Sequence, residues 1–242
     1  MKMMVIARKN WLEIIRDPLN IAFGLGFPMG LMLLFTLIQR NIPVTLFELP
    51  HLTPGIAVFG HSFLALFAST TLARDRRSAL LQRLYTTPLS AVHYIGGYFL
   101  PLIPLGLLQS LLCYAAALAL GMAWHASILV AVFASMLSAL FFIALGLLLG
   151  SIFNDKQAGG LCGGLLTNLC AVFSGAWFDL TMAGGIFESI AKALPFYHAV
   201  EMGRLLLRDA SGLLPHLWIL LSYILTITAA ATLLFLRQMR RR

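Results

Sequence analysis

Six apolar segments, each long enough to cross a bilayer as a helix, constrain this chain more than any other feature. A hydrocarbon core is about 30 Å thick, so a crossing helix needs roughly 20 apolar residues. The segments span 18–38, 53–73, 90–121, 127–153, 158–178 and 213–236. The third is long and contains Pro101 and Pro104, which predict a kink. The pattern predicts an all-α integral membrane protein, a single transmembrane domain over 1–242 with six transmembrane helices.

Composition favours lipid over water as the solvent of this chain. Of the 242 residues, 60% are apolar and 11% charged, whereas a typical soluble domain has about 25% charged residues. The net charge of +8 raises nucleic acid as a partner. The basic residues, however, form short clusters between uncharged stretches, which is typical of topology signals. We therefore expect a lipid membrane, and no nucleic acid, as a partner.

The basic residues also predict the orientation of the chain. With six spans, both termini lie on one side, and that side carries 13 of the 17 lysines and arginines. Cytoplasmic loops of membrane proteins carry the excess of positive charge. Both termini are predicted to be cytoplasmic.

Residues 1–17 predict an amphipathic helix before the first span. One helical face carries the apolar residues Met4, Ala7, Trp11 and Ile15. Such a helix is expected to lie flat on the cytoplasmic leaflet. Asp17 can cap a new helix and Pro18 is tolerated at its first position, so an elbow is predicted there.

The largest cytoplasmic loop, residues 74–89, carries a second amphipathic pattern. Its apolar patch consists of Leu80, Leu81, Leu84 and Tyr85, and Thr87-Pro88 ends the helix. An exposed helix of this kind can dock in a groove on a partner protein. It can equally lie on the membrane surface, and the residues alone leave both interpretations open.

The segment 179–212 is predicted to form two short re-entrant helices on the outer side, separated by Pro195. Such backbone is tolerated only where protein covers it or water reaches it. Glu188 with Lys192 is an i,i+4 pair, and Glu201 with Arg204 is an i,i+3 pair.

The spans contain no Asp, Glu, Lys or Arg in their interiors, which argues against proton-coupled or ion-coupled transport. His61 is the one ionisable side chain well inside a span. It is a candidate for substrate contact, although a hydrogen bond between packed helices is the commoner role.

Glycines mark helix contacts and a weak point. Two GxxxG pairs, Gly26 with Gly30 and Gly146 with Gly150, permit close helix approach. Four glycines lie together at the start of the fifth span: Gly159, Gly160, Gly163 and Gly164. They should weaken that helix, so it either packs tightly or bends, and both suit a moving part.

No catalytic or metal site is predicted. The chain lacks a Gly-x-x-x-x-Gly-Lys-Ser/Thr loop for ATP, and it has no Cys/His or carboxylate cluster of metal-ligand spacing. Its cysteines, Cys113, Cys162 and Cys170, lie in apolar segments. An intramembrane hydrolase built on Ser174 and His216 is disfavoured, because Val172 stands where the usual glycine would be.

With this layout in place, three sequence motifs resemble the ABC-2 family of exporter permeases. The first is Arg-Asp-Pro at 16–18. The second, Gln82-Arg83-Leu84-Tyr85-Thr86-Thr87-Pro88-Leu89-Ser90, is similar to the family's coupling helix, with Ala79 and Gln82 replacing an expected Gly and Glu. The third, Leu194-Pro195 to Glu201 followed by Arg204, is similar to the family's Leu-Pro-x-x-x-x-x-Glu-x-x-Arg run.

The resemblance implies a permease of the cytoplasmic (inner) membrane, paired with a second copy, as a homodimer, and bound to two ABC-type ATP-binding subunits. ATP and Mg would bind to those subunits, and this chain would need no cofactor. Its cargo would be an amphiphilic small molecule, drug or natural product. A glycan or lipid exporter of the same family is the nearest alternative, and a stand-alone enzyme or channel is the rival class. The resemblance assigns ATPase coupling to Leu80, Leu81, Arg83, Leu84, Tyr85, Thr86, Thr87 and Pro88.

Overall fold

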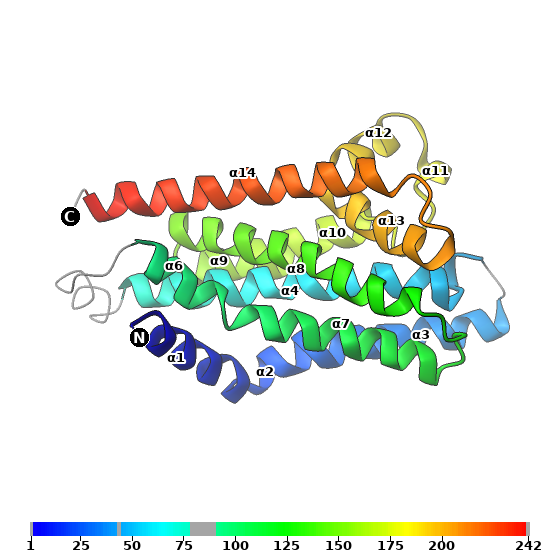
Figure 1. Ribbon diagram of the computed structural model, residues 1–242, viewed down its shortest axis with the longest axis horizontal. Helices are drawn as coiled ribbons and strands as arrows, with labels where there is room; N and C mark the ends of the chain where they lie inside the picture. Colours follow the sequence, from blue (N-terminus) through cyan, green and yellow to red (C-terminus); the bar gives the residue numbers. More distant parts are fainter. Residues whose placement is uncertain (1, 43–44, 78–90, 241–242) are drawn as a thin grey trace.

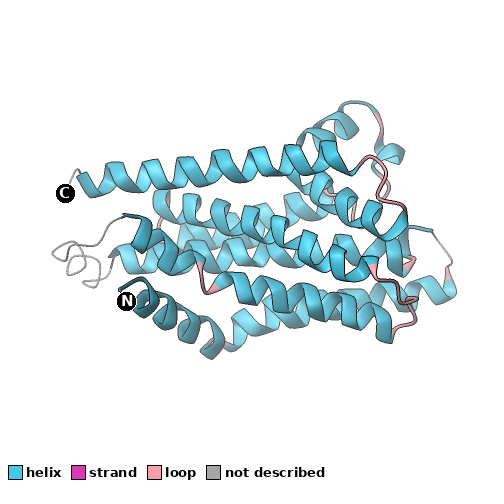
Figure 2. Ribbon diagram, viewed as in Figure 1, coloured by secondary structure: helices cyan, strands magenta, loops and turns pink. Residues whose placement is uncertain are grey.

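The computed structural model describes residues 2–42, 45–77 and 91–240, and within these ranges every regular element is a helix (Figure 2). The long helices lie side by side along one axis, and α11, α12 and α13 gather at one end (Figure 1). That end is called the α13 end below. Helix α1 (Lys2–Arg16) and the last turns of α14 (Leu213–Arg240) lie at the opposite end, called the α1 end.

The first span begins where predicted. The Asp17 carboxylate accepts a hydrogen bond of 3.0 Å from the Leu19 N–H and caps α2 (Pro18–Ile21), with Pro18 in the first turn. The chain continues through a π-helix, η1 (Ala22–Gly26), into α3 (Phe27–Asn41). The predicted cap at Asp17, with Pro18 in the first turn, is present.

Helix α1 buries a face that overlaps the predicted apolar stripe only in part, at Ala7 and Trp11. Ile6, Asn10 and Ile14 are buried against the bundle, whereas Met4 and Ile15 are exposed. Because Ile6, Asn10 and Ile14 repeat at helical spacing, they form a second face that the apolar-stripe count missed. The polar Asn10 belongs to this contact, so hydrophobicity alone could not identify it.

Helix α4 (Leu49–Arg77), preceded by η2 (Thr45–Phe47), is the central helix and is buried along most of its length. Helix α8 (Ser127–Ile152) packs closely against it through Gly146 and Gly150. A Cβ at these positions would lie 2.4 Å from the Ala65 carbonyl oxygen and 2.6 Å from that of Ser69. Only glycine allows this approach, so the predicted role of this GxxxG pair is confirmed. A Cβ at Gly26 or Gly30 meets nothing within 4 Å in the described residues.

The predicted kink in the third span is a break between two helices. Helix α6 (Ala91–Phe99) ends before Pro101, and α7 (Leu102–Ala119) begins after it. Pro104 lies within the first turn of α7, where the missing N–H costs little.

Five helices in the described part of the chain are long and apolar enough to cross a membrane: Pro18–Asn41, Leu49–Arg77, His93–Ala119, Ser127–Ile152 and Leu213–Leu234. The predicted fifth span, 158–178, is not among them. Its helical part is divided into α9 (Asp155–Gly159), the π-helix η3 (Gly160–Leu166) and α10 (Thr167–Phe173). The glycine-rich stretch coincides with η3, because glycine gives a helix little resistance to a change of its hydrogen-bond register.

Three short helices, rather than the two expected, form the α13 end. Helix α11 (Leu180–Ala183) is capped by Asp179, and Gly184, with φ of +58°, leads into α12 (Gly185–Ala193). Pro195 opens α13 (Pro195–Arg208) and separates it from α12, as predicted.

Candidate functional site

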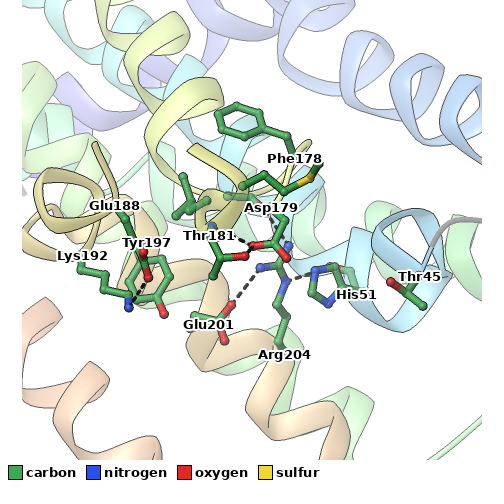
Figure 3. Close-up of a pocket in the computed structure, with 13 residues that line it drawn as sticks. Thr45, His51, Phe178, Asp179, Thr181, Glu188, Lys192, Tyr197, Glu201 and Arg204 are labelled. Carbon is green, nitrogen blue, oxygen red and sulfur yellow. Dashed lines mark hydrogen bonds and ion pairs between the residues drawn. The ribbon is translucent and has the colours of Figure 1, made fainter. Parts of the chain in front are cut away.

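A polar cavity of about 450 Å³ lies at the α13 end, between the short helices and the start of α4 (Figure 3). Charged and aromatic side chains of both halves of the chain line it, including His51, Asp179, Glu188, Tyr197, Glu201 and Arg204. The three short helices therefore enclose a polar space over the bundle.

Arg204 is the structural centre of this region. Its guanidinium donates to the Glu201 carboxylate at 2.8 Å, to the His51 carbonyl at 3.1 Å and to the Gly175 carbonyl at 2.8 Å. The residue is only 5% exposed. Burial lowers the pKa of the Arg204 guanidinium, and the hydrogen bond to Glu201 opposes that shift. Arg204 thus joins α13 to the start of α4 and to the turn after α10.

The second predicted pair at this end has a different setting. Glu188 and Lys192 form an ion pair of 2.6 Å, in which the Lys192 side chain is 52% exposed. Both predicted pairs are present, but the Glu201–Arg204 pair is buried on its cationic side and the Glu188–Lys192 pair is open to solvent. Contacts of exposed pairs contribute little to stability.

Two histidines fasten α13 to α14. His198 Nε2 lies 2.8 Å from the Lys192 carbonyl oxygen, and His198 Nδ1 lies 2.9 Å from His216 Nδ1. Because a carbonyl only accepts, Nε2 of His198 carries the proton, and His216 Nδ1–H donates to His198 Nδ1. Burial and the neighbouring His216 lower the pKa of His198.

The α1 end has its own buried charge, which sequence reasoning missed. The Asp75 carboxylate, with 8% of its side chain exposed, accepts hydrogen bonds from Lys9 Nζ at 2.6 and 2.7 Å. It also accepts one of 2.6 Å from the Tyr98 hydroxyl, which lies 2.9 Å from the Tyr94 hydroxyl. Tyr94 and Tyr98 are spaced i,i+4 in the third predicted span, and this polar spacing was the signal available in the sequence.

His61 is completely buried between three helices. Its Nδ1 lies 2.7 Å from the Ser138 hydroxyl, and its Nε2 lies 3.0 Å from the Ser110 hydroxyl and 3.3 Å from the Gly106 carbonyl. These contacts fit the packing interpretation, since they join α4 to α7 and α8. A substrate contact by His61 stays a prediction.

An aromatic run follows the contact between α3 and α4. Its neighbouring ring centroids lie 5.0 to 6.3 Å apart and belong to Phe23, Phe63, Phe27, Phe59, Trp177, Phe35 and Phe47. Phe23 and Phe27 are 46% and 42% exposed, so one end of the run is open. The Trp177 Nε1 is buried without a hydrogen-bond partner in the described residues. The run is therefore largely buried, with an exposed end at Phe23 and Phe27.

The predicted flexible glycines have open surroundings. A Cβ at Gly160 or Gly164 meets nothing within 4 Å, and one at Gly163 meets Leu66 at 3.4 Å, an ordinary contact. Within the described residues, close packing does not explain these glycines. Movement of this segment stays a prediction.

The predicted ATPase-coupling residues, Leu80, Leu81, Arg83, Leu84, Tyr85, Thr86, Thr87 and Pro88, lie outside the described residues. Their role is therefore a prediction from sequence. The described elements on either side of them, α4 and α6, meet at the Asp75 cluster.

Comparison with known protein families gives one result. The family model described as "ABC-2 type transporter" matches residues 1–207. No curated protein matches the chain. The matched region includes α1 to α12 and nearly all of α13, and hence both buried charges and the cavity.

Proposed function

Because the chain belongs to the ABC-2 type transporter family, we propose that it is the membrane-spanning permease subunit of an ATP-binding-cassette exporter. It works as a homodimer in the cytoplasmic (inner) membrane with two copies of a separate ATPase. ATP and Mg bind to that ATPase, since this sequence lacks a phosphate-binding loop. The family match over 1–207 is the observation that carries the proposal.

The arrangement of helices supports six crossings with both termini cytoplasmic. Helix α1 and the last turns of α14 lie at the same end of the bundle, which requires an even number of crossings between them (Figure 1). The continuous helical stretch from α9 through η3 to α10 covers 155–173. At 1.5 Å per residue it is about 28 Å long, close to the thickness of a hydrocarbon core. It supplies the sixth crossing.

A topology reporter tests this arrangement. A reporter active only in the cytoplasm is expected to work at both termini and after Ser78, and to fail after Glu48 or Ser189. Cytoplasmic activity at either of the last two sites would contradict six spans.

The cargo is an amphiphilic small molecule, drug or natural product that moves outward. The exposed end of the aromatic run, Phe23 and Phe27, supports this class, because aromatic faces bind flat apolar groups. The same surface also favours the second candidate, a glycan or lipid exporter, since sugar rings stack on aromatic faces. Two assays distinguish these candidates: efflux of a cationic aromatic dye for the first, and transfer of a lipid-linked glycan for the second.

The coupling assignment is tested through Leu84. Leu84→Asp should abolish recovery of the ATPase on tagged permease, because it places a charge in an apolar anchor worth roughly 1.5–3 kcal/mol. Leu84→Met, the matched control, should retain recovery. Arg83→Ala should act weakly, since an exposed charge contributes about 0–1 kcal/mol. The measurements are vanadate-sensitive ATP hydrolysis of the purified complex and identification of a protein with a phosphate-binding loop.

One result would refute the proposed function, and a second would refute only the coupling assignment. Wild-type permease that recovers no such ATPase would remove the transporter assignment. Normal ATPase recovery by Leu84→Asp would leave the family membership intact but would show that residues 74–89 do not carry the docking contact.

A further inference from the structure

The Asp75 carboxylate receives donors from two other segments of the chain. Lys9 belongs to α1 and Tyr98 to α6, and they lie 66 and 23 residues from Asp75. A buried carboxylate is costly unless charged or hydroxyl donors surround it, and removing one donor leaves that cost uncompensated. The cluster therefore holds three segments in one arrangement.

Backbone packing around the cluster reinforces the contact between α1 and α6. Asn10 Nδ2 donates to the Gly97 carbonyl at 3.0 Å. A Cβ at Gly97 would lie 2.7 Å from Ile6, and one at Gly96 would lie 2.7 Å from Met3. Helix α1 thus lies directly on the glycine face of α6, which positions Lys9 beside Asp75.

The cluster lies next to the segment that is assigned to ATPase coupling. Asp75 lies in the last turn of α4, which ends at Arg77, and Tyr98 lies in α6, which begins at Ala91. The segment assigned to ATPase coupling connects these two helices in sequence. A displacement of the end of α4 therefore reaches α1 through the Asp75 carboxylate, whereas α6 also contacts α1 directly at Gly96 and Gly97.

We propose that Asp75 is a positioning residue that fastens α1 to the ends of α4 and α6, so that movement driven by the ATPase also moves α1. The inference rests on the proposed function for its driving force, but the fastening itself is a property of this chain. Lys9 and Tyr98 are side-chain donors, so a rotamer change can release them without unfolding a helix.

Hydrogen–deuterium exchange on the purified permease–ATPase complex tests this role. In the wild type, ATP with vanadate should change exchange in peptides covering both 78–90 and 2–16. In Asp75→Asn, peptides covering 78–90 should still respond, while the response of 2–16 disappears. Without nucleotide, residues 2–16 should exchange at least about tenfold faster, since breaking a buried pair costs more than the 1.4 kcal/mol that corresponds to a factor of ten.

Matched variants separate positioning from folding. Glu13 also pairs with Lys9, but its side chain is 43% exposed. Glu13→Gln removes this exposed partner and should leave hydrogen exchange of α1 unchanged. Tyr98→Phe removes one O–H donor and no charge, and should speed exchange of α1 about threefold. If Asp75→Asn does not insert, Tyr98→Phe carries the test.

The double variant Lys9→Gln with Asp75→Asn removes both charges. It should restore insertion and thermal stability relative to either single variant, yet leave 2–16 unresponsive to nucleotide. The proposal would be overturned if, in Asp75→Asn, residues 2–16 kept both their protection from hydrogen exchange and their response to nucleotide. The same outcome in Tyr98→Phe would overturn it where that variant replaces Asp75→Asn. If the wild-type permease retains no ATPase, the proposed function is refuted instead. Hydrogen exchange of α1 without nucleotide then still tests whether Asp75 fastens α1 to α4 and α6.

Discussion

Among the described residues, each end of the molecule buries one Asp, Glu, Lys or Arg side chain, and the two buried charges have different kinds of hydrogen-bond partner. At the α13 end, Arg204 donates to two backbone carbonyls, those of His51 and Gly175, besides the Glu201 carboxylate. At the α1 end, Asp75 accepts from the side chains of Lys9 and Tyr98.

The difference separates a fixed contact from a releasable one. The Arg204 guanidinium is only 5% exposed and bonds three separated acceptors, so its release would break three hydrogen bonds together. Arg204 therefore holds the short helices in one arrangement. A lysine or tyrosine side chain can rotate away from its acceptor while its helix stays intact. We therefore expect the α13 end to stay rigid, and the α1 end to be able to change its contacts.

Loss of Arg204 should have the largest effect on stability. Arg204→Ala leaves Glu201 and two buried carbonyls without their donor, and should destabilise the protein by about 3–5 kcal/mol. Arg204→Lys should recover only part of this, because an ammonium cannot serve three separated acceptors at once. Unfolding of the purified protein on titration with a denaturing detergent measures both. A cost for Arg204→Ala below that for Asp75→Asn would reverse the comparison.

The two carboxylates at the α13 end should differ in the same assay. Glu201→Ala removes a charged hydrogen bond to a buried guanidinium and should cost about 1.5–3 kcal/mol. Glu188→Ala breaks a pair whose lysine is exposed, so its effect should be close to zero. Near-neutral results for both variants would show that the carbonyls alone hold Arg204.

A smaller effect is expected from pH at the His198–His216 contact. The pKa of His198 is lowered in the folded protein, so the contact is complete above the ordinary histidine value of about 6.5. It should weaken as the pH falls below that value toward the lowered pKa, because a proton on His198 Nδ1 removes the acceptor. Burial and the neighbouring His216 lower the pKa of His198, and the hydrogen bond to the Lys192 carbonyl opposes that shift.

The loss should be at most about 1 kcal/mol, the net worth of one hydrogen bond. It should appear as the pH falls below about 6.5, as easier release of α13 in hydrogen exchange. His198→Gln should remove this pH dependence, and His125→Gln, at an exposed position, should retain it. A pH-independent α13 in the wild type would contradict the assigned proton positions.

Local features of the fold could be predicted from sequence because their causes lie within a turn or two of helix. Asp17 caps the first span, Pro101 breaks the third, and Glu201 pairs with Arg204 three residues later. Each depends on backbone geometry that neighbouring residues share. The buried face of α1 could be predicted only in part for the opposite reason, since the polar Asn10 is buried where it donates to the Gly97 carbonyl of the distant helix α6.

By itself, the sequence determined that this chain is helical and built for a membrane, because long apolar segments leave the backbone no other way to satisfy its hydrogen bonds in lipid. Only the tertiary structure decided which charges are buried and what compensates them. Arg204 donates to the carbonyl of His51, which lies 153 residues away in the sequence, and Asp75 accepts from Lys9, which lies 66 residues away. Such partners are selected by how helices pack, and packing depends on every side chain in the contact rather than on spacing along the chain.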